Sequence, residues 1–221
     1  MNEDPFQALR HMMAEIILAH IEATRELTQV ESLDQRMLDA MIRVPREEFV
    51  PAEMRAYAHA DGPLPIGFDK TISQPFITAL MTGLLDPRED ERVLEIGTGL
   101  GYHTAVLSEL AGQVYSVEII GGLLDQARER LGAQGINNVE TRLGNGRLGW
   151  PEFAPFDKII LAASAELMPP ELLNQLKPGG RMVLPTGIEG AQQLMLVDKD
   201  MDGRISTREV LGVRFALLEE C

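Results

Sequence analysis

Near its middle the chain reads Arg92-Val93-Leu94-Glu95-Ile96-Gly97-Thr98-Gly99-Leu100-Gly101-Tyr102-His103-Thr104-Ala105. This stretch begins with a short apolar run that has an acid near its end. Three glycines at every second position follow, and then an apolar-periodic segment. This order predicts a buried strand, a tight turn and the start of a helix. Glycines let the backbone turn sharply and let a ligand approach the main chain closely. In dinucleotide-binding turns, spaced Gly-x-Gly-x-x-Gly, a pyrophosphate lies on the helix N-terminus. Because Glu95 would repel a pyrophosphate, this different spacing favours a ligand with a cationic amine.

A second acid follows at the end of the next predicted strand, residues 113–118. Nucleoside-binding α/β folds place a ribose-binding carboxylate at about this separation, and the Glu118 carboxylate can accept hydrogen bonds from two hydroxyls. One acid for an amine, glycines for close approach and one acid for a ribose together point to S-adenosylmethionine. The alternative is a strand-to-helix turn with a purely structural role.

The composition is that of an ordinary globular protein with a strongly acidic balance. The chain has 221 residues, 45% of them hydrophobic and 24% charged, and a net charge of −14. This charge argues against nucleic-acid or anionic-membrane partners, which need clustered Lys and Arg. The single cysteine, Cys221, excludes an intrachain disulfide and favours a reducing compartment. Since we find neither a signal-peptide pattern nor an apolar run of membrane-spanning length, we expect a cytoplasmic protein.

The first 60 residues are expected to be helical. Residues 6–29 carry apolar side chains at helical spacing, and Ser32-Leu33-Asp34 opens a second helix whose methionines are expected to fill core gaps. Residues 47–57 predict a further short helix interrupted at Pro51. Residues 61–75, rich in Pro and Gly, predict a packed loop, after which Ser73 or Thr71 is expected to cap a helix over 75–85.

From Val93 onward predicted strands and helices alternate, which indicates a parallel sheet with helices on both faces. The last part of the chain lacks a helix and predicts an antiparallel hairpin at the sheet edge, closed by Asp-Gly turn chemistry. The strands are expected at 92–97, 113–118, 138–143, 157–162 and 180–186, and the helices between them at 101–111, 120–134 and 169–177.

Residues 198–209 fit the spacing of a calcium loop, with acids at positions one, three, five and twelve and glycine at position six. A calcium-binding EF-hand needs a helix on each side, whereas both flanks here are predicted to be strands. The sequence therefore favours a hairpin turn, with calcium binding as the alternative.

Several motifs beyond the glycine turn give the chain a specific resemblance. It resembles the protein-L-isoaspartate O-methyltransferase family from about residue 30 to residue 218. The Thr-Ile-Ser-x-Pro element, together with Leu-Pro-Ile-Gly, is much more specific than the glycine turn that all class I methyltransferases share. The matching segments are residues 44–51, 64–67, 71–75, 93–102, 144–150, 154–157, 176–180 and 183–187.

The resemblance implies a fold and an activity. The fold is a doubly wound, mostly parallel seven-stranded α/β sheet of the class I methyltransferase type, in a single domain. Within it we expect an N-terminal helical extension (1–60), a cofactor-binding core (61–187) and a C-terminal hairpin (188–221). The activity is methyl transfer from S-adenosylmethionine to the free carboxylate of L-isoaspartyl residues in damaged proteins or peptides. Separately from the resemblance, we expect a monomer.

Residue roles follow from the same resemblance. Ser73 matches the active-site serine, and it would orient the acceptor carboxylate. No general base is required, because that carboxylate is already ionised at neutral pH. No metal is expected. The implied cofactor-binding residues are Thr71, Ile72, Ser73, Thr98, then Glu95, Gly97 and Gly99 for the amino-acid end, Glu118 for the ribose, and Asn145 and Gly146 for the adenine. The substrate-side candidates are Ile66, Lys70 and Glu166.

The sequence departs from the family pattern at a few positions. Asn145 replaces the usual Asp of a Gly-Asp-Gly element, Gly67-Phe68-Asp69-Lys70 replaces Gly-x-Gly-Gln, and Glu166 stands among usually small residues. The last two changes lie on the presumed substrate side. They keep two alternatives open: a diverged methyltransferase with another acceptor, and a non-catalytic adenosyl-ligand or calcium-responsive binding module.

Overall fold

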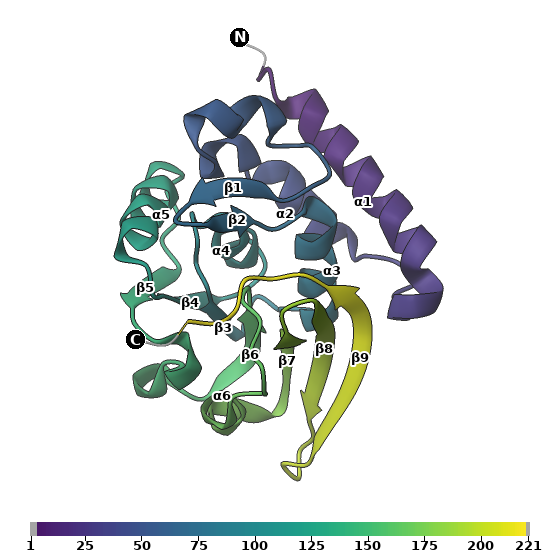
Figure 1. Cartoon of the computed structure of the whole chain (residues 1–221), viewed down its shortest axis with the longest axis vertical. Helices are drawn as coiled ribbons and strands as arrows, with labels where there is room; N and C mark the ends of the chain where they lie inside the picture. Colours follow the sequence, from purple (N-terminus) through teal and green to yellow (C-terminus); the bar gives the residue numbers. More distant parts are fainter. Residues whose placement is uncertain (1–3, 220–221) are drawn as a thin grey trace.

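The computed structural model describes residues 4–219 and has a seven-stranded sheet at its centre (Figure 1). The strand order is β5-β4-β3-β6-β7-β8-β9, in which the first five strands are parallel and the last two antiparallel. Cys221 lies outside the described residues. The parallel strands are β3 (Arg92–Ile96), β4 (Gln113–Glu118), β5 (Val139–Leu143), β6 (Phe156–Leu161) and β7 (Leu176–Ile188).

Neighbouring residues of each strand point to opposite sides of the sheet, and both sides are buried under other elements. Val93 packs with the large helical layer, whereas Leu94 packs on the opposite face with Trp150 and Leu172. The large layer contains α4 (Tyr102–Ser108) and α5 (Gly121–Ala133), and the other face is covered by α6 (Pro170–Gln175) and the short 3₁₀ segments η3 (Gly146–Leu148) and η4 (Pro151–Phe153). The predicted doubly wound α/β sheet is therefore confirmed.

The C-terminal hairpin is also confirmed. Strands β8 (Ala191–Lys199) and β9 (Ile205–Val213) pair antiparallel and extend the edge at β7 (Figure 1). In the turn, Asp200 Oδ1 accepts hydrogen bonds from the backbone N–H groups of Asp202 and Arg204, and Arg204 pairs with both acids. These acids are engaged in closing a β-turn between two strands, not in a loop between two helices.

The N-terminal region forms α1 (Gln7–Thr28), α2 (Gln35–Arg43) and two short 3₁₀ helices, η1 (Arg46–Phe49) and η2 (Ala52–Tyr57), separated at Pro51. Asp34 caps α2 by accepting from the Arg36 N–H group. None of the described helices is both long and apolar enough to cross a membrane.

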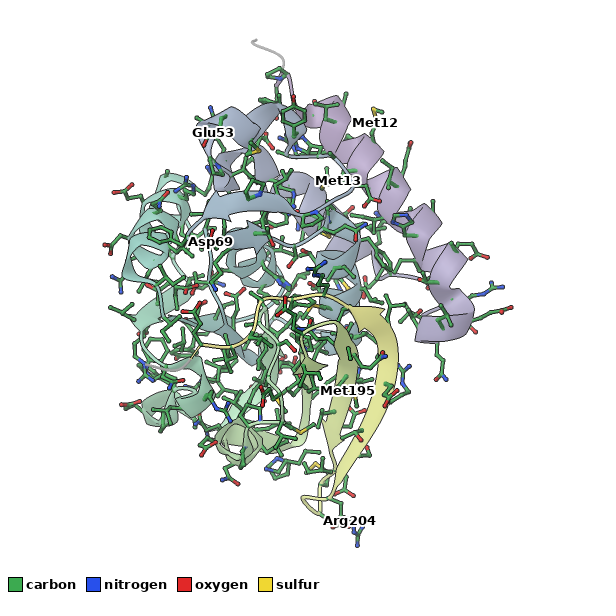
Figure 2. All side chains as sticks on the ribbon, in the orientation of Figure 1. Met12, Met13, Glu53, Asp69, Met195 and Arg204 are labelled. Atoms are coloured by element: carbon green, nitrogen blue, oxygen red, sulfur yellow. The ribbon has the colours of Figure 1, made fainter. Side chains whose placement is uncertain are left out.

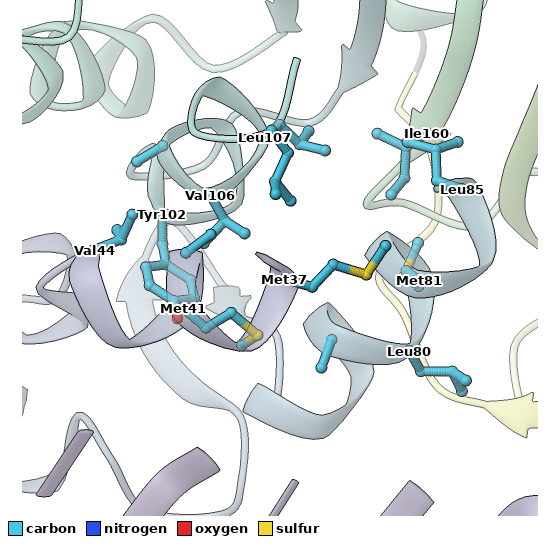
Figure 3. Packing of buried hydrophobic residues seen from close by; sticks show 14 of the residues in the cluster. Met37, Met41, Val44, Leu80, Met81, Leu85, Tyr102, Val106, Leu107 and Ile160 are labelled. Atoms are coloured by element: carbon cyan, nitrogen blue, oxygen red, sulfur yellow. The ribbon is translucent and has the colours of Figure 1, made fainter. Parts of the chain in front are cut away.

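The methionines of this region fill the core, as predicted. Met37 and Met41 of α2 lie between Leu80 and Met81 of α3 (Pro75–Leu85) and the side chains of α4 (Figure 3). Not all apolar residues of α1 face the core. Met13 is 1% exposed, whereas Met12 is 55% exposed and projects from the outer side (Figure 2).

Two local predictions were wrong. Residues 61–75 are not simply a loop, since β1 (Leu64–Gly67) and β2 (Lys70–Ile72) form an antiparallel hairpin. Its turn residues, Phe68 and Asp69, both have positive φ, a conformation that Gly or Asn usually signals in sequence. Neither Ser73 nor Thr71 caps α3. Gln74 occupies that position without a side-chain hydrogen bond, and Pro75 begins the helix.

Met13→Ala should lower the free energy of unfolding by about 2–5 kcal/mol, because it leaves a cavity in a packed core. Met12→Ala is the matched control on the same helix and should change it by less than about 0.5 kcal/mol. Urea unfolding followed by circular dichroism measures both, and similar losses in the two variants would contradict the assigned faces of α1.

Candidate functional site

A cavity of about 340 Å³ opens at the carboxyl ends of β3, β4 and β6. The helices change sides between β3 and β6, so the cavity lies at the topological switch point where α/β sheets bind ligands. The β1–β2 hairpin and the start of α3 form one wall, and residues 212–219, which comprise the end of β9 and the segment after it, form another. We call residues 212–219 the C-terminal strap.

The glycine turn forms the floor of the cavity. Gly97 and Gly99 have φ angles of +95° and +58°, which only glycine adopts readily. A Cβ atom on Gly97 would lie 3.4 Å from Ala162 Cβ, and one on Gly99 would lie 3.4 Å from Ile66 Cδ1 in the cavity wall. Between them Thr98 is anchored by a 2.6 Å hydrogen bond to the Ser116 hydroxyl. The main chain of the turn is therefore held in place and has no side chain at Gly97 or Gly99 that would keep a ligand away from it.

Glu118 ends β4 at the edge of this turn, and its carboxylate lines the cavity. Its Oε2 accepts from the Gly99 N–H group at 2.8 Å, and its Oε1 accepts from those of Ile119 and Ile120 at 2.9 and 3.0 Å. A carboxylate offers about four acceptor sites, so this group can still accept a bond from a ligand hydroxyl.

Glu95 lies beneath the turn and does not line the cavity. Its carboxyl group is fully buried, and its Oε2 accepts from the hydroxyls of Thr104 and Ser116 at 2.5 and 2.6 Å. Its Oε1 has no hydrogen-bond partner among the described residues. Burial, and secondarily the nearby Glu118 charge, raises the Glu95 pKa to about 7.

Ser73, between β2 and α3, also lines the cavity. It is half-buried, and no described residue hydrogen-bonds its hydroxyl. Lys70, on the same wall, forms an ion pair with Glu219 of the strap, so its charge is partly neutralised. A free hydroxyl facing the cavity suits the binding of a polar acceptor group.

His103 also lines the cavity, at the start of α4. Its Nε2 lies 2.9 Å from the Thr82 hydroxyl. Burial lowers the pKa of His103 to about 4, and the Arg46 charge contributes, so the imidazole is neutral at pH 7. The structure therefore places a neutral imidazole in the cavity wall.

Most of the predicted site residues come together in this cavity, and three do not. Glu95 lies below it, Asn145 is engaged by the Arg147 N–H group through its Oδ1, and Glu166 is exposed outside the lining. The predicted residues that line it are Ile66, Lys70, Thr71, Ile72, Ser73, Gly97, Thr98, Gly99, Glu118 and Gly146.

The strap is the part of the site that sequence reasoning missed. Buried Gln192 holds it with both ends of its amide, donating to the Phe215 carbonyl at 3.0 Å and accepting from the Phe215 N–H group at 2.6 Å. Ser164 pairs with Ala216 and Leu218 by backbone hydrogen bonds. The sequence carries no periodic signal that would bring these residues back over the sheet.

Comparison with known proteins gives a consistent result. A family model described as protein-L-isoaspartate(D-aspartate) O-methyltransferase matches residues 21–220. Protein-L-isoaspartate O-methyltransferase 1 of Polaromonas sp. is 55% identical over 100% of this chain and 93% of its own length. Protein-L-isoaspartate O-methyltransferase 2 of Syntrophobacter fumaroxidans is 50% identical over 98% of this chain and 88% of its own length.

Two solved structures share the fold. One, a protein-L-isoaspartate O-methyltransferase, has a TM-score of 0.82 at 28% identity and covers 96% of this chain, which in turn spans 66% of that chain. The other, a Plasmodium falciparum protein in complex with S-adenosyl-L-homocysteine, has a TM-score of 0.76 at 21% identity and covers 98% of this chain and 99% of its own.

The sheet order and the cavity at its switch point define a class I methyltransferase, whose cofactor is S-adenosylmethionine. The bare glycine turn and the Glu118 carboxylate beside it fit an adenosyl ligand that carries an amino-acid end. The chain belongs to the protein-L-isoaspartate(D-aspartate) O-methyltransferase family.

Glu95→Gln should stabilise the ligand-free protein by about 2–3 kcal/mol more at pH 8.5 than at pH 5. The folded-state pKa of Glu95 is raised from 4.5 to about 7, so between these values the unfolded chain releases a proton that the folded chain keeps. Wild-type stability therefore falls as pH rises from 4.5 to 7, and the glutamine variant lacks this loss. Urea unfolding at both pH values measures the difference.

Glu140→Gln, the same change at an exposed position of β5, is the control and should leave the pH dependence unaltered. Parallel pH profiles for wild type and Glu95→Gln would show that Glu95 is ionised in the fold throughout this range.

Proposed function

We propose that this chain transfers the methyl group of S-adenosylmethionine to the free carboxylate of L-isoaspartyl residues in damaged proteins or peptides. One observation carries the proposal: the bare glycine turn, the Glu118 carboxylate and Ser73, whose hydroxyl no described residue binds, line a single cavity. Family membership over residues 21–220 supports the choice of acceptor.

The chemistry requires little from the protein beyond positioning. When bound, the cofactor supplies an electrophilic methyl group on a sulfonium. The acceptor carboxylate is ionised at neutral pH, so it attacks without a general base. Catalysis then comes from aligning the two groups in line and excluding water, which an enclosed cavity with a rigid floor provides.

We assign Ser73 as the residue that orients the acceptor, by donating its hydroxyl hydrogen to a carboxylate oxygen. Thr71 and Ile72 shape the adjoining wall. Ile66 and Lys70 border the acceptor end, where Lys70 remains a candidate attraction for an anion despite its pairing with Glu219.

We assign the opposite end of the cavity to the cofactor. Gly97, Thr98 and Gly99 receive the amino-acid end through the main chain, and Glu118 accepts from the ribose. Glu95 is buried below the turn and does not touch the amino-acid end. It acts on that end through its negative potential and by accepting the hydrogen bonds from Thr104 and Ser116 that support the turn. Gly146 approaches the adenine directly.

Asn145 and Glu166 keep weaker assignments, because neither lines the cavity. Asn145 fixes the segment that presents Gly146, by accepting from the Arg147 N–H group. Glu166 is retained as a substrate-side candidate outside the cavity, where a long peptide acceptor would extend.

A diverged acceptor is the second candidate function. The tip of the β1–β2 hairpin favours it, since Phe68 and Asp69 both have positive φ and Phe68 packs on Gly122 at the start of α5 (Figure 2 labels Asp69). A non-glycine turn of this kind gives the hairpin tip side chains that a glycine turn would lack. A binding module without catalysis is disfavoured by the free Ser73 hydroxyl.

We also propose a single-domain monomer that acts in the cytoplasm without nucleic acid. The net charge of −14 disfavours a polyanionic partner, and the single cysteine suits a reducing compartment. The division into residues 1–60, 61–187 and 188–221 stays a prediction.

Wild-type protein with labelled S-adenosylmethionine should methylate an isoaspartyl peptide and leave the matched aspartyl peptide unlabelled. The label should be base-labile, because a carboxyl methyl ester hydrolyses in base. Transfer to neither peptide, with S-adenosylhomocysteine binding intact by calorimetry, would reject the isoaspartyl acceptor and favour the diverged one.

Ser73→Ala should lower methyl transfer at least about tenfold while leaving the Kd of S-adenosylhomocysteine within about twofold, because it removes a donor from the acceptor side only. Glu118→Ala should instead weaken cofactor binding and raise the Kd of S-adenosylhomocysteine about tenfold or more. Each variant is the control for the other. Unchanged turnover in Ser73→Ala removes Ser73 from the mechanism, and an unchanged Kd in Glu118→Ala removes the ribose assignment.

A further inference from the structure

Arg46 is a fully buried arginine that joins three segments at the acceptor end of the cavity. Its Nη2 donates to the Ser73 carbonyl at 2.7 Å, and its Nε donates to the Ala58 carbonyl at 2.8 Å. Its guanidinium carbon lies 4.6 Å from the centre of the Tyr102 ring, which lines the cavity. One planar group therefore fixes the backbone of the residue that we assign to the acceptor, together with the wall behind it.

No described carboxylate neutralises Arg46. The neighbouring Glu47 is held by Arg10 and His59 instead. Within the described residues, Nη1 of Arg46 and the Tyr102 hydroxyl lack a hydrogen bond of normal geometry. Burial lowers the Arg46 pKa, and the adjacent Tyr102 hydroxyl opposes this shift by interacting with the guanidinium. Burying a charge without a counter-ion is unfavourable, so stability alone does not account for this residue.

The charge of Arg46 is felt inside the cavity. It contributes to the lowered pKa of His103, second to burial. His103 and Tyr102 line the cavity on the Arg46 side, whereas Glu118 lines it beside the glycine turn, with Glu95 buried below. The strap adds Arg214 and Glu219 to the lining, and Glu219 pairs with Lys70. Arg46 therefore places a buried cation behind Ser73, while the buried Glu95 lies under the turn.

We propose that Arg46 is a positioning residue of the acceptor site, which fixes the Ser73 backbone and gives this end of the cavity a positive potential that attracts a carboxylate. This inference rests on the proposed function. In a protein of net charge −14, an anionic acceptor meets general repulsion, and a local buried cation offsets it where the acceptor must bind.

The reaction itself predicts which kinetic constant Arg46 affects. The acceptor oxygen bonds to the methyl carbon, and the electron pair of the breaking C–S bond stays on sulfur. A negative and a positive charge both disappear, so attraction between Arg46 and the carboxylate is strongest before the transition state. An interaction that is stronger with the bound acceptor than with the transition state lowers KM without raising kcat. Its loss therefore raises KM and does not lower kcat.

The test compares Arg46→Lys, which keeps a cation but cannot reproduce the planar fork, with Arg46→Met, which removes the charge. The KM for the isoaspartyl peptide should rise about threefold in the lysine variant and at least about tenfold in the methionine variant. The kcat should stay within about threefold of wild type, and the Kd of S-adenosylhomocysteine within about twofold.

Arg10→Met is the matched control, because Arg10 is also buried but pairs with Asp4 and Glu47 and does not line the cavity. It should lower the unfolding temperature without raising the acceptor KM. If Arg46→Met does not fold, the lysine variant decides: an acceptor KM equal to wild type rejects the proposal.

Where both variants fold, a KM in Arg46→Met no higher than in Arg46→Lys, or an equal rise in the S-adenosylhomocysteine Kd, also rejects it. If the wild type methylates no isoaspartyl peptide, the proposed function is rejected. If the wild type is active and the Arg46 variants have unchanged kinetics, only this inference is rejected.

Discussion

The burial of the Glu95 carboxyl group under the glycine turn is the constraint on which the rest of the site depends. Its hydrogen bonds from Ser116 and Thr104 tie β3 to β4 and to the start of α4. Ser116 in turn holds Thr98, and Glu118 holds Gly99 from the other side. Two acids at the ends of adjacent parallel strands thus set the turn, and rigid strands give it a fixed position relative to the sheet.

The cavity combines this rigid floor with walls that come from distant parts of the chain. The floor belongs to the strand ends, whereas the walls are the β1–β2 hairpin, the start of α3 and the strap. Buried polar groups join these walls to the body, Arg46 at the hairpin side and Gln192 at the strap side, and both bind main-chain atoms. A polar side chain that bonds backbone fixes a segment whatever side chains that segment carries, which leaves the cavity mouth free to vary.

The central fold could be predicted from the sequence because its signals are local and repeated. The apolar runs of β3, β4 and β6 and the helices between them follow from periodicity, and the glycine turn follows from spacing. The β1–β2 hairpin could not be predicted, because Phe68 and Asp69 carry no turn signature, and neither could the strap, whose position depends on a long-range bond from Gln192. Glu95 illustrates the limit for the site, since the sequence places it beside the turn but cannot tell burial beneath from exposure in the cavity.

The strap also has a consequence for the order of events during synthesis. The glycine turn and Glu118 are encoded by residue 118, but the wall formed by residues 212–219 comes almost a hundred residues later. A chain still being translated can pair β3, β4 and β6 before this wall has left the ribosome. Ligand binding in the complete cavity is therefore a late event, and a nascent chain becomes able to hold its cofactor only after its sheet edge has closed.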